Sequence, residues 1–464
     1  MKRREALKTL LAAMALPSLL PSQLALGAIH KGATSQAKRP NIILILADDL
    51  GYGQLGCDGN RFNETPNLDR IAREGLRFSN AYASAAVCSP TRAALMTGQH
   101  PARQGITDYL ARDDEHYLSP SYVTINERLK SAGYATGLIG KWHLTGDYDK
   151  NLGAPHRHGW DEVLLSETRY IASGAYFAPY SFMPRVEPRE PNEYLTDRLN
   201  AEAVDFIRRH RDEPFFLYLS HYAVHKTLAA KGDVIAKYAA KPGAGSNGND
   251  PLLAAMLESI DDGVGQILHT LKDLGLDDNT LIVFTSDNGG EMPTAPLRTV
   301  KSTLYEGGIR VPLVMRYPAG MRAGAVSHTP VVTHDFYPTF MELADVRSPA
   351  RQPVDGISLT PLFSGPYELS RNTLYWHYPR AKPHALGGRS SGAIRYADYK
   401  LIEFFDTGEV ELYDLRHDIG ESKNLAAAMP RRVAELRDML GAWRVSTHAS
   451  MEPMRTLAMT AARR

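Results

Sequence analysis

The fold class of this chain is indicated by the stretch Asn41-Ile42-Ile43-Leu44-Ile45-Leu46-Ala47-Asp48-Asp49. Its apolar run from Ile42 to Leu46 is typical of a strand that is buried on both faces of a parallel sheet. Two aspartates follow at the point where that strand ends. Because ligands of open α/β sheets bind beyond the carboxyl ends of the strands, Asp48 and Asp49 are candidate functional residues.

Three other apolar runs end in the same way, in polar residues that are able to take part in chemistry. They are 281–285 before Asp287-Asn288-Gly289-Gly290, 135–139 before Gly140-Lys141-Trp142-His143, and 215–219 before His221 and His225. Amphipathic helices are expected between the strands, at 67–74, 124–132, 197–210 and 252–274. This alternation predicts an α/β fold with a large, mostly parallel central sheet flanked by helices.

The polar residues at two of these strand ends carry only oxygen ligands: Asp48, Asp49, Asp287 and Asn288. Oxygen donors favour a hard divalent cation, Ca²⁺ or alternatively Mg²⁺, over zinc. Each pair taken singly is also typical of a turn or a helix cap, but two pairs at two strand ends favour a metal site. Asp261-Asp262, inside the helix expected at 252–274, are interpreted as a solvated helix face.

A second informative stretch is Cys88-Ser89-Pro90-Thr91-Arg92-Ala93-Ala94-Leu95-Met96-Thr97-Gly98, which holds one of only 2 cysteines in 464 residues. Ser89 suits a helix cap and Pro90 the first helical position, so a helix is expected to start here. A helix N-terminus and the charge of Arg92 together favour an anion site. The alternative, a buried structural cysteine, fits less well with the cap and the adjacent arginine.

This eleven-residue stretch resembles the signature of the type I, formylglycine-dependent sulfatases of the alkaline phosphatase superfamily. The resemblance implies an alkaline-phosphatase-like fold, sulfuric ester hydrolase activity and conversion of Cys88 to formylglycine (3-oxoalanine). It implies that a hydroxyl of the hydrated aldehyde attacks sulfur, and that a formylglycine-generating maturation enzyme is a partner. The metal would be held by Asp48, Asp49, Asp287, Asn288 and the modified Cys88.

The segment 133–143 resembles the second signature of the family. The resemblance makes Lys141 and His143 catalytic residues that, with Arg92, hold the formylglycine, and Lys141 would also bind the sulfate. A diol hydroxyl is a weak nucleophile unless a metal and a base lower its pKa, and Asp287 is a candidate base. Lys141 taken alone would be interpreted as a surface lysine.

Two further segments are similar to family segments that contact sulfate. Lys301, in the segment 301–312, would bind the sulfate, and His225 would bind it and protonate the leaving oxygen. The family usually has a proline shortly after this histidine, whereas this chain has Lys226-Thr227-Leu228. Gln54 is a second departure, because many relatives have aspartate there.

The composition shifts near residue 345, where a stretch rich in Pro, Gly and Ser predicts a linker. We therefore expect a catalytic domain at 40–345 and a smaller C-terminal α+β subdomain at 346–464. Short strands at 393–396, 399–405 and 409–415 predict an antiparallel sheet, and a final helix is expected from about residue 430. The aromatic and basic segment 376–384 either faces the substrate or only packs on the catalytic domain, so Arg380, His384 and Arg389 are candidate sugar contacts.

The N-terminal segment 1–28 is typical of an export signal, with a basic start, a short apolar run and a small-residue cleavage site. It predicts an exported, periplasmic protein that uses the Sec or the twin-arginine route. No stretch is long enough to span a bilayer. Removing this segment takes +3 from the formal charge of +1 and leaves about −2, so the mature protein lacks the basic character of nucleic-acid binders.

The resemblance to the sulfatases, together with the export signal, implies hydrolysis of sulfate esters, with a sulfated saccharide or polysaccharide fragment as the expected substrate. A phosphonate monoester or phosphodiester hydrolase of the same superfamily is the nearest alternative. A non-catalytic saccharide-binding protein is an alternative of another class.

Overall fold

The computed structural model describes residues 39–112, 114–169, 176–246, 248–349, 351–365 and 368–454. The described residues from Arg39 onward belong to one compact unit. The expected export signal at 1–28 lies outside the described residues. Among the helices in these ranges, none is both long enough and apolar enough to cross a membrane.

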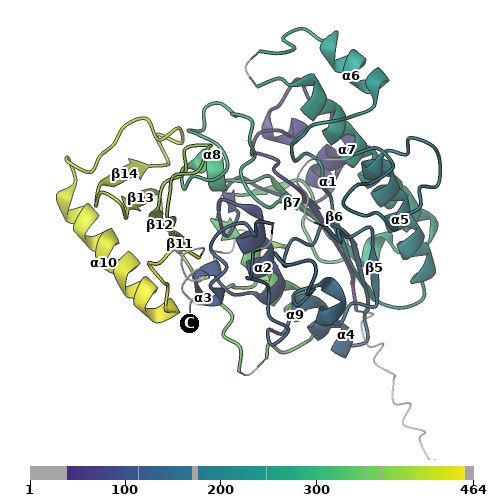
Figure 1. Ribbon diagram of the computed structural model, residues 1–464, viewed down its shortest axis with the longest axis horizontal. Helices are drawn as coiled ribbons and strands as arrows, with labels where there is room; N and C mark the ends of the chain where they lie inside the picture. Colours follow the sequence, from purple (N-terminus) through teal and green to yellow (C-terminus); the bar gives the residue numbers. More distant parts are fainter. Residues whose placement is uncertain are drawn as a thin grey trace, which may run out of the picture. The chain divides into compact units, whose positions relative to one another are not determined.

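In the described part of the chain, the largest sheet has eight strands (Figure 1). Their order is β5 (Glu162–Leu164), β4 (Ala135–Gly140), β6 (Phe215–Ser220), β1 (Asn41–Ala47), β7 (Thr280–Ser286), β8 (Leu313–Arg316), β2 (Leu76–Phe78) and β9 (Ala325–Ser327). Neighbouring strands are parallel except at β8, which is antiparallel to both β7 and β2. The predicted mostly parallel central sheet is confirmed.

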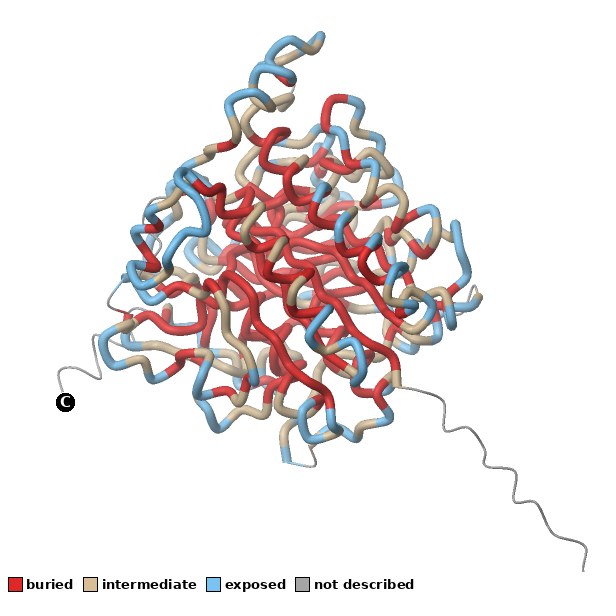
Figure 2. Tube along the Cα trace, turned by 90° about the vertical axis from the view of Figure 1, so that its right-hand side faces the viewer, coloured by how far each residue is buried: buried red, intermediate tan, exposed pale blue. Residues whose placement is uncertain are grey.

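Successive residues of β1 enter two hydrophobic cores, one on each face of this sheet (Figure 1). Ile43 and Ile45 pack with α1 (Pro66–Glu74), α5 (Leu195–Arg209), α6 (Gly232–Ala239) and α7 (Pro251–Asp273). Ile42 and Leu44 pack with α2 (Cys88–Thr97), α4 (Ile125–Ser131) and α9 (Phe336–Leu343). The strands between these layers form the buried centre in Figure 2, as the continuous apolar run predicted.

Short elements connect these layers. β3 (Ala81–Tyr82) pairs with β10 (Val331–Val332) in a small parallel sheet. The others are α3 (Pro101–Gln104), α8 (Glu306–Ile309) and the 3-10 turns η1 (Gly56–Asp58), η2 (Pro155–His158), η3 (Asp277–Asn279), η4 (Thr333–Asp335) and η5 (Thr360–Leu362).

A four-stranded antiparallel sheet follows, as predicted, with the strand order β11 (Thr373–Tyr378), β12 (Ser391–Tyr396), β13 (Tyr399–Phe404) and β14 (Val410–Asp414). Helix α10 (Pro430–Thr447) packs on it through Leu436 and Leu440. The sequence did not predict β11, whose Trp376 is fully buried and donates a hydrogen bond to the carbonyl of Ala83 at 2.9 Å. Trp376 therefore packs the second sheet onto the first part of the chain, while the domain boundary near residue 345 stays a prediction.

The registers of the large sheet bring its polar strand ends together. Ala47 of β1 lies beside Ser286 of β7, and Leu46 of β1 lies beside Ser220 of β6. Gly140 of β4 lies beside the same Ser220. Because these strands are parallel, the residues that follow them meet at one edge.

The expected helix at Cys88 is present, but the expected cap is wrong. Helix α2 begins at Cys88, after Val87, and no side chain caps its N-terminus. The chain after α3 passes over this helix start, and the backbone N–H of Leu110 donates to Ser89 Oγ at 3.0 Å.

The interpretation of Asp261 as part of a solvated helix face is also wrong. Asp261 is buried in α7 and accepts hydrogen bonds from the backbone N–H groups of Asn67 and Leu68, at 3.0 and 2.8 Å. The N-terminus of α1 covers this face of α7, so Asp261 satisfies amides that the first turn of a helix leaves unpaired. Its neighbour Asp262 is exposed.

A buried ionic network joins the four-stranded sheet to helix α8. Lys400 of β13 lies 2.9 Å from Glu306 Oε1 and 3.0 Å from Glu421 Oε1, and none of the three side chains is exposed. Arg310 lies 2.7 Å from the other oxygen of Glu306. The backbone N–H of Glu306 donates to Glu421 at 2.7 Å, so Lys400 also supports the segment that carries Lys301.

We predict that Lys400→Met destabilises the protein by about 3 kcal/mol or more, because it leaves two buried carboxylates without their shared cation. Urea unfolding followed by circular dichroism measures this change. The control is Arg432→Ala, which removes an exposed ion pair with Glu435 and is expected to cost less than about 1 kcal/mol. Equal free energies of unfolding for the two variants would contradict the role given to the network.

Candidate active site

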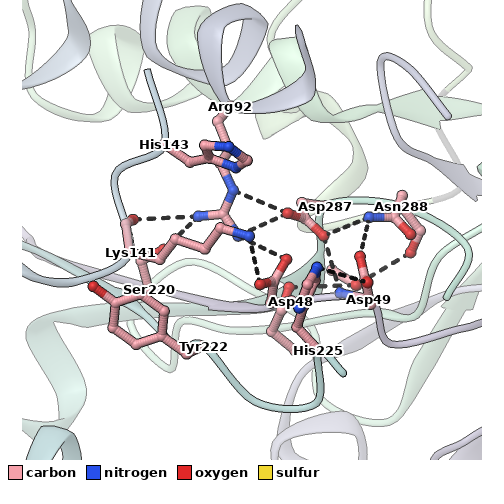
Figure 3. Close-up of polar contacts among 12 residues, drawn as sticks. Asp48, Asp49, Arg92, Lys141, His143, Ser220, Tyr222, His225, Asp287 and Asn288 are labelled. Atoms are coloured by element: carbon pink, nitrogen blue, oxygen red, sulfur yellow. Dashed lines mark hydrogen bonds and ion pairs between the residues drawn. The ribbon is translucent and has the colours of Figure 1, made fainter. Parts of the chain in front are cut away.

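The residues with predicted catalytic and metal-binding roles lie together at the carboxyl edge of the large sheet (Figure 3). They are Asp48, Asp49, Cys88, Arg92, Lys141, His143, His225, Asp287, Asn288 and Lys301. All are buried except His225, which is partly exposed. They come from the ends of β1, β4, β6 and β7, from α2, and from the segment before α8.

The guanidinium of Arg92 is the centre of this cluster, and it is completely buried (Figure 3). Its Nε and one terminal nitrogen lie 2.9 and 2.7 Å from Asp287 Oδ2, and the same terminal nitrogen lies 3.3 Å from Asp48 Oδ1. The other terminal nitrogen donates to Ser220 Oγ at 2.7 Å and to the carbonyl of Lys141 at 3.3 Å. One side chain of α2 therefore ties four strand ends together.

Two lysines each pair with one of the aspartates that follow β1. Lys141 Nζ lies 2.5 Å from Asp48 Oδ2, and Lys301 Nζ lies 2.5 Å from Asp49 Oδ2. Burial acts to lower the pKa of both lysines, but the nearby carboxylates raise it above the usual value. Burial acts to raise the pKa of Asp49, and the charges of Lys301, His225 and Lys141 lower it overall. Both lysines and Asp49 are therefore charged at neutral pH.

The carboxylates fit a hard divalent cation. Asp48, Cys88 and Asp287 form the one group of three or more His, Cys, Asp or Glu side chains in the described ranges whose potential ligand atoms all lie within 4.8 Å of one another. Burial raises the pKa of Asp287 to about 6, against the opposing charge of Arg92. A cation between these carboxylates would offset that cost of burial, and their oxygens are the donors that Ca²⁺ and Mg²⁺ prefer.

The side-chain amide nitrogen of Asn288 points toward Asp49 and Asp287. The nitrogen lies 2.6 Å from Asp49 Oδ1 and 2.9 Å from Asp287 Oδ1, while the amide oxygen accepts from the N–H of Gly290 at 2.9 Å. A cation ligand at this position would have to be the oxygen, because the amide nitrogen is only a donor. Asn288 and Asp49 are thus potential additional ligands beside the set formed by Asp48, Cys88 and Asp287.

Cys88 is the first residue of α2 and is almost fully buried. Burial raises the pKa of its thiol to about 11, although Lys141 and Lys301 oppose that shift. The thiol is therefore protonated at neutral pH and is a poor nucleophile.

The two histidines differ in their hydrogen bonds. His143 Nε2 lies 2.9 Å from the carbonyl of Leu110, so this nitrogen carries a proton, and burial lowers the pKa of the ring. His225 Nδ1 lies 2.6 Å from the carbonyl of Lys226, while its Nε2 lies 3.6 Å from Asp49 Oδ2. Burial lowers the pKa of His225 to about 4, despite Asp49, which acts to raise it. Both rings are neutral at pH 7.

His384 lies on a turn that reaches the active site. A Cβ at Gly388 would lie only 1.7 Å from the carbonyl oxygen of Ser302, the residue after Lys301. The N–H of His384 donates to the carbonyl of Gly388 at 2.7 Å, and its ring lies edge-on to Tyr109 at 6.2 Å. Glycine at position 388 thus permits the close approach of this turn to the segment of Lys301.

The two predicted arginine contacts are engaged within the protein. Arg380 is largely buried and lies 2.6 Å from Asp108 Oδ2. Arg389 lies 2.9 Å from Asp406, in the turn after β13, and stacks over Phe404 at 4.1 Å. Neither arginine is brought into the cluster around Cys88 by any of the contacts described.

Three residues of the site were missed in the sequence. Ser220 ends β6 and could have been found as another polar strand end. Glu291 lies 3.7 Å from Lys301 and 2.9 Å from Lys226. It comes directly after the strand-end sequence Asp287-Asn288-Gly289-Gly290. Glu167 carries no sequence signal, because its principal partners are backbone N–H groups and a tyrosine.

Comparison with known proteins identifies the family of this chain. The Sulfatase family model matches residues 40–346, and the model for the C-terminal region of N-sulphoglucosamine sulphohydrolase matches residues 300–444. A protein described as Sulfatase from Formosa agariphila is 32% identical, with 90% of this chain and 92% of that protein covered. Human N-acetylgalactosamine-6-sulfatase is 34% identical, with 74% of this chain and 70% of that protein covered.

A solved structure is also similar. It is the crystal structure of Ps i-CgsB in complex with k-i-k-neocarrahexaose, which is 31% identical with a TM-score of 0.78 and covers 89% of this chain and 94% of its own. The match agrees with the predicted alkaline-phosphatase-like architecture. Because the family model spans the part of the chain that supplies all the residues around Cys88, this chain belongs to the sulfatase family and is a sulfuric ester hydrolase.

Proposed function

We propose that this sulfatase removes sulfate from a sulfated saccharide or polysaccharide fragment, with Cys88 matured to formylglycine beside a divalent cation. The observation that carries the proposal is the setting of Cys88. A thiol that is protonated at neutral pH lies among three buried carboxylates and three buried cations, where it would be inert without modification. Asp48, Asp49, Asp287 and Asn288, with residue 88, would hold the cation, and Ca²⁺ suits these oxygens, with Mg²⁺ as the alternative.

When present, the hydrated aldehyde supplies the attacking oxygen and the cation supplies Lewis-acid charge beside it. Lys141 and Lys301 neutralise the sulfate oxygens, since both are charged and each lies 2.5 Å from one of the aspartates that follow β1. Arg92 has its hydrogen bonds inside the protein, so its contribution is to hold Asp48, Asp287 and the Lys141 loop in place.

The histidines supply proton transfer in this proposal. His225 is partly exposed, and an anionic ester beside it raises its pKa, so that Nε2 gains the proton that it donates to the leaving oxygen. His143 keeps its proton on Nε2, which leaves Nδ1 as the acceptor nitrogen of the neutral ring. We assign to His143 the uptake of the proton that is released when sulfate leaves residue 88.

A saccharide substrate is supported by the named relatives and by the turn at His384. Human N-acetylgalactosamine-6-sulfatase and the oligosaccharide complex of Ps i-CgsB are both above 30% identity. His384 adjoins the segment of Lys301 and is the first candidate for a sugar contact. Arg380 and Arg389 remain weaker candidates, because Asp108 and Asp406 already pair with them.

The proposal also includes the partner and the compartment expected from the sequence. Maturation of Cys88 needs a formylglycine-generating enzyme, and the segment 1–28 would direct export to the periplasm by the Sec or the twin-arginine route.

We predict that Cys88→Ala reduces sulfate release to the background rate, because it removes the precursor of the attacking oxygen. Cys57→Ala is the matched control, since it changes the other cysteine and should keep wild-type turnover. Peptide mass analysis of wild-type protein, coproduced with a formylglycine-generating enzyme, should find aldehyde in place of thiol at residue 88. Wild-type turnover by the Cys88→Ala variant would refute the mechanism.

We further predict that an aryl sulfate is hydrolysed with a kcat/KM at least about 10²-fold above that of the aryl phosphodiester with the same leaving group. A sulfate monoester presents three oxygens to the buried lysines, whereas a phosphodiester must place a second ester group there. A preference for the phosphodiester would favour the alternative superfamily activity.

We also predict that sulfate is released faster from defined sulfated disaccharides than from a sulfated steroid. Measuring sulfate release from both tests the saccharide assignment, and a preference for the steroid would contradict it.

A further inference from the structure

The carboxylate of Glu167 bridges two successive backbone amides of the loop after β4. Its Oε2 accepts from the N–H of Trp142 at 3.0 Å, and its Oε1 accepts from the N–H of His143 at 2.5 Å. The hydroxyl of Tyr222 donates to Oε2 at 2.9 Å. Glu167 is 6% exposed. These neutral donors replace the water that a buried carboxylate has lost.

The backbone of this loop has the conformation that favours such an anion. Successive N–H groups converge on one point when a residue adopts the left-handed region, and such concavities bind anions. His143 has a φ of 53°, which costs a residue other than glycine roughly 1–2 kcal/mol. The bidentate contact with Glu167 stabilises this conformation against the ordinary right-handed one.

The same loop fixes the neighbouring catalytic groups. Lys141 precedes it, and its carbonyl accepts from Arg92 while its Nζ lies 2.5 Å from Asp48. A rotation of the peptide between Lys141 and Trp142 would turn this carbonyl away from Arg92. The imidazole of His143 would move with the following peptide.

Tyr222 links the hydrogen bonds of Glu167 to the loop of His225. Its hydroxyl donates to Glu167, and its carbonyl accepts from the hydroxyl of Tyr176 at 2.7 Å. The same hydroxyl of Tyr176 lies 2.7 Å from the carbonyl of His225. Figure 3 places Tyr222 beside Ser220 and Lys141 at the edge of the cluster. One carboxylate thus supports both loops that carry the histidines.

We infer that Glu167 is a positioning residue, whose carboxylate holds the loop of Lys141 and His143 in its working conformation. This inference rests on the proposed function, which gives those two residues their roles. Glu167 exerts its effect through the two amides that it binds.

The test is Glu167→Gln in the full-length, matured protein. Glutamine keeps the shape but must turn its NH₂ group toward an N–H or the Tyr222 hydroxyl, so one hydrogen bond to the loop is lost. We expect kcat for an aryl sulfate to fall on the order of 10–100-fold, with KM changed less than about 3-fold.

Asp261→Asn is the matched control. Asp261 is also a buried carboxylate that accepts from two successive backbone amides, those of Asn67 and Leu68, but far along the chain from the catalytic loops. The control should lower the melting temperature while keeping wild-type kcat. A kcat for Glu167→Gln within about 2-fold of wild type would overturn the inference, as would equal losses of kcat in both variants.

If Glu167→Gln does not fold, Tyr222→Phe removes one hydrogen-bond donor to Glu167 and should lower kcat with KM little changed. Unchanged kcat in that variant would also overturn the inference. Failure of the proposed function is distinguishable, because the wild-type protein would then release no sulfate from any of the tested esters.

Discussion

The buried guanidinium of Arg92 is the contact on which the rest of the active site depends. It lies 2.7 Å from Asp287 and also bonds to Asp48, to Ser220 and to the Lys141 carbonyl. The large sheet alone would bring its polar strand ends near one another, but their carboxylates would repel. A cation delivered from α2 holds them together and fixes residue 88 one turn away. Removing such a buried cation leaves uncompensated charges, at a cost of roughly 3–5 kcal/mol.

The charges of the cluster also explain its choice of substrate. The carboxylates of Asp48, Asp49 and Asp287 are matched in number by the cations of Arg92, Lys141 and Lys301, which form ion pairs with them. A site with equal numbers of positive and negative side chains has no net attraction for an anion. A divalent cation would make it positive and so suited to a sulfate ester, although the whole chain is nearly neutral. With that cation bound, the anion would be attracted by a local charge and not by the protein surface.

Much of this arrangement could be predicted from the sequence, since long apolar runs that end in polar residues define parallel strands and their functional edge. The sequence could not reveal contacts made by backbone groups, which is why Glu167 was missed and Ser89 was given a cap that it does not form. Asp261 looked solvated because the helix that covers it is distant in sequence. Strand β11 was missed because its aromatic residues suggested a binding segment, whereas Trp376 is fully buried and donates a hydrogen bond to the carbonyl of Ala83.

We propose that the strand-end carboxylates form a hard-cation site beside residue 88. Elemental analysis of the matured, full-length protein, alongside an Asp48→Asn variant, shows whether such an ion is bound. We predict about one calcium or magnesium ion per chain in the wild type, and loss of that ion in the variant while circular dichroism stays unchanged. A wild-type protein that turns over without bound metal, or that retains stoichiometric zinc instead, would contradict the account.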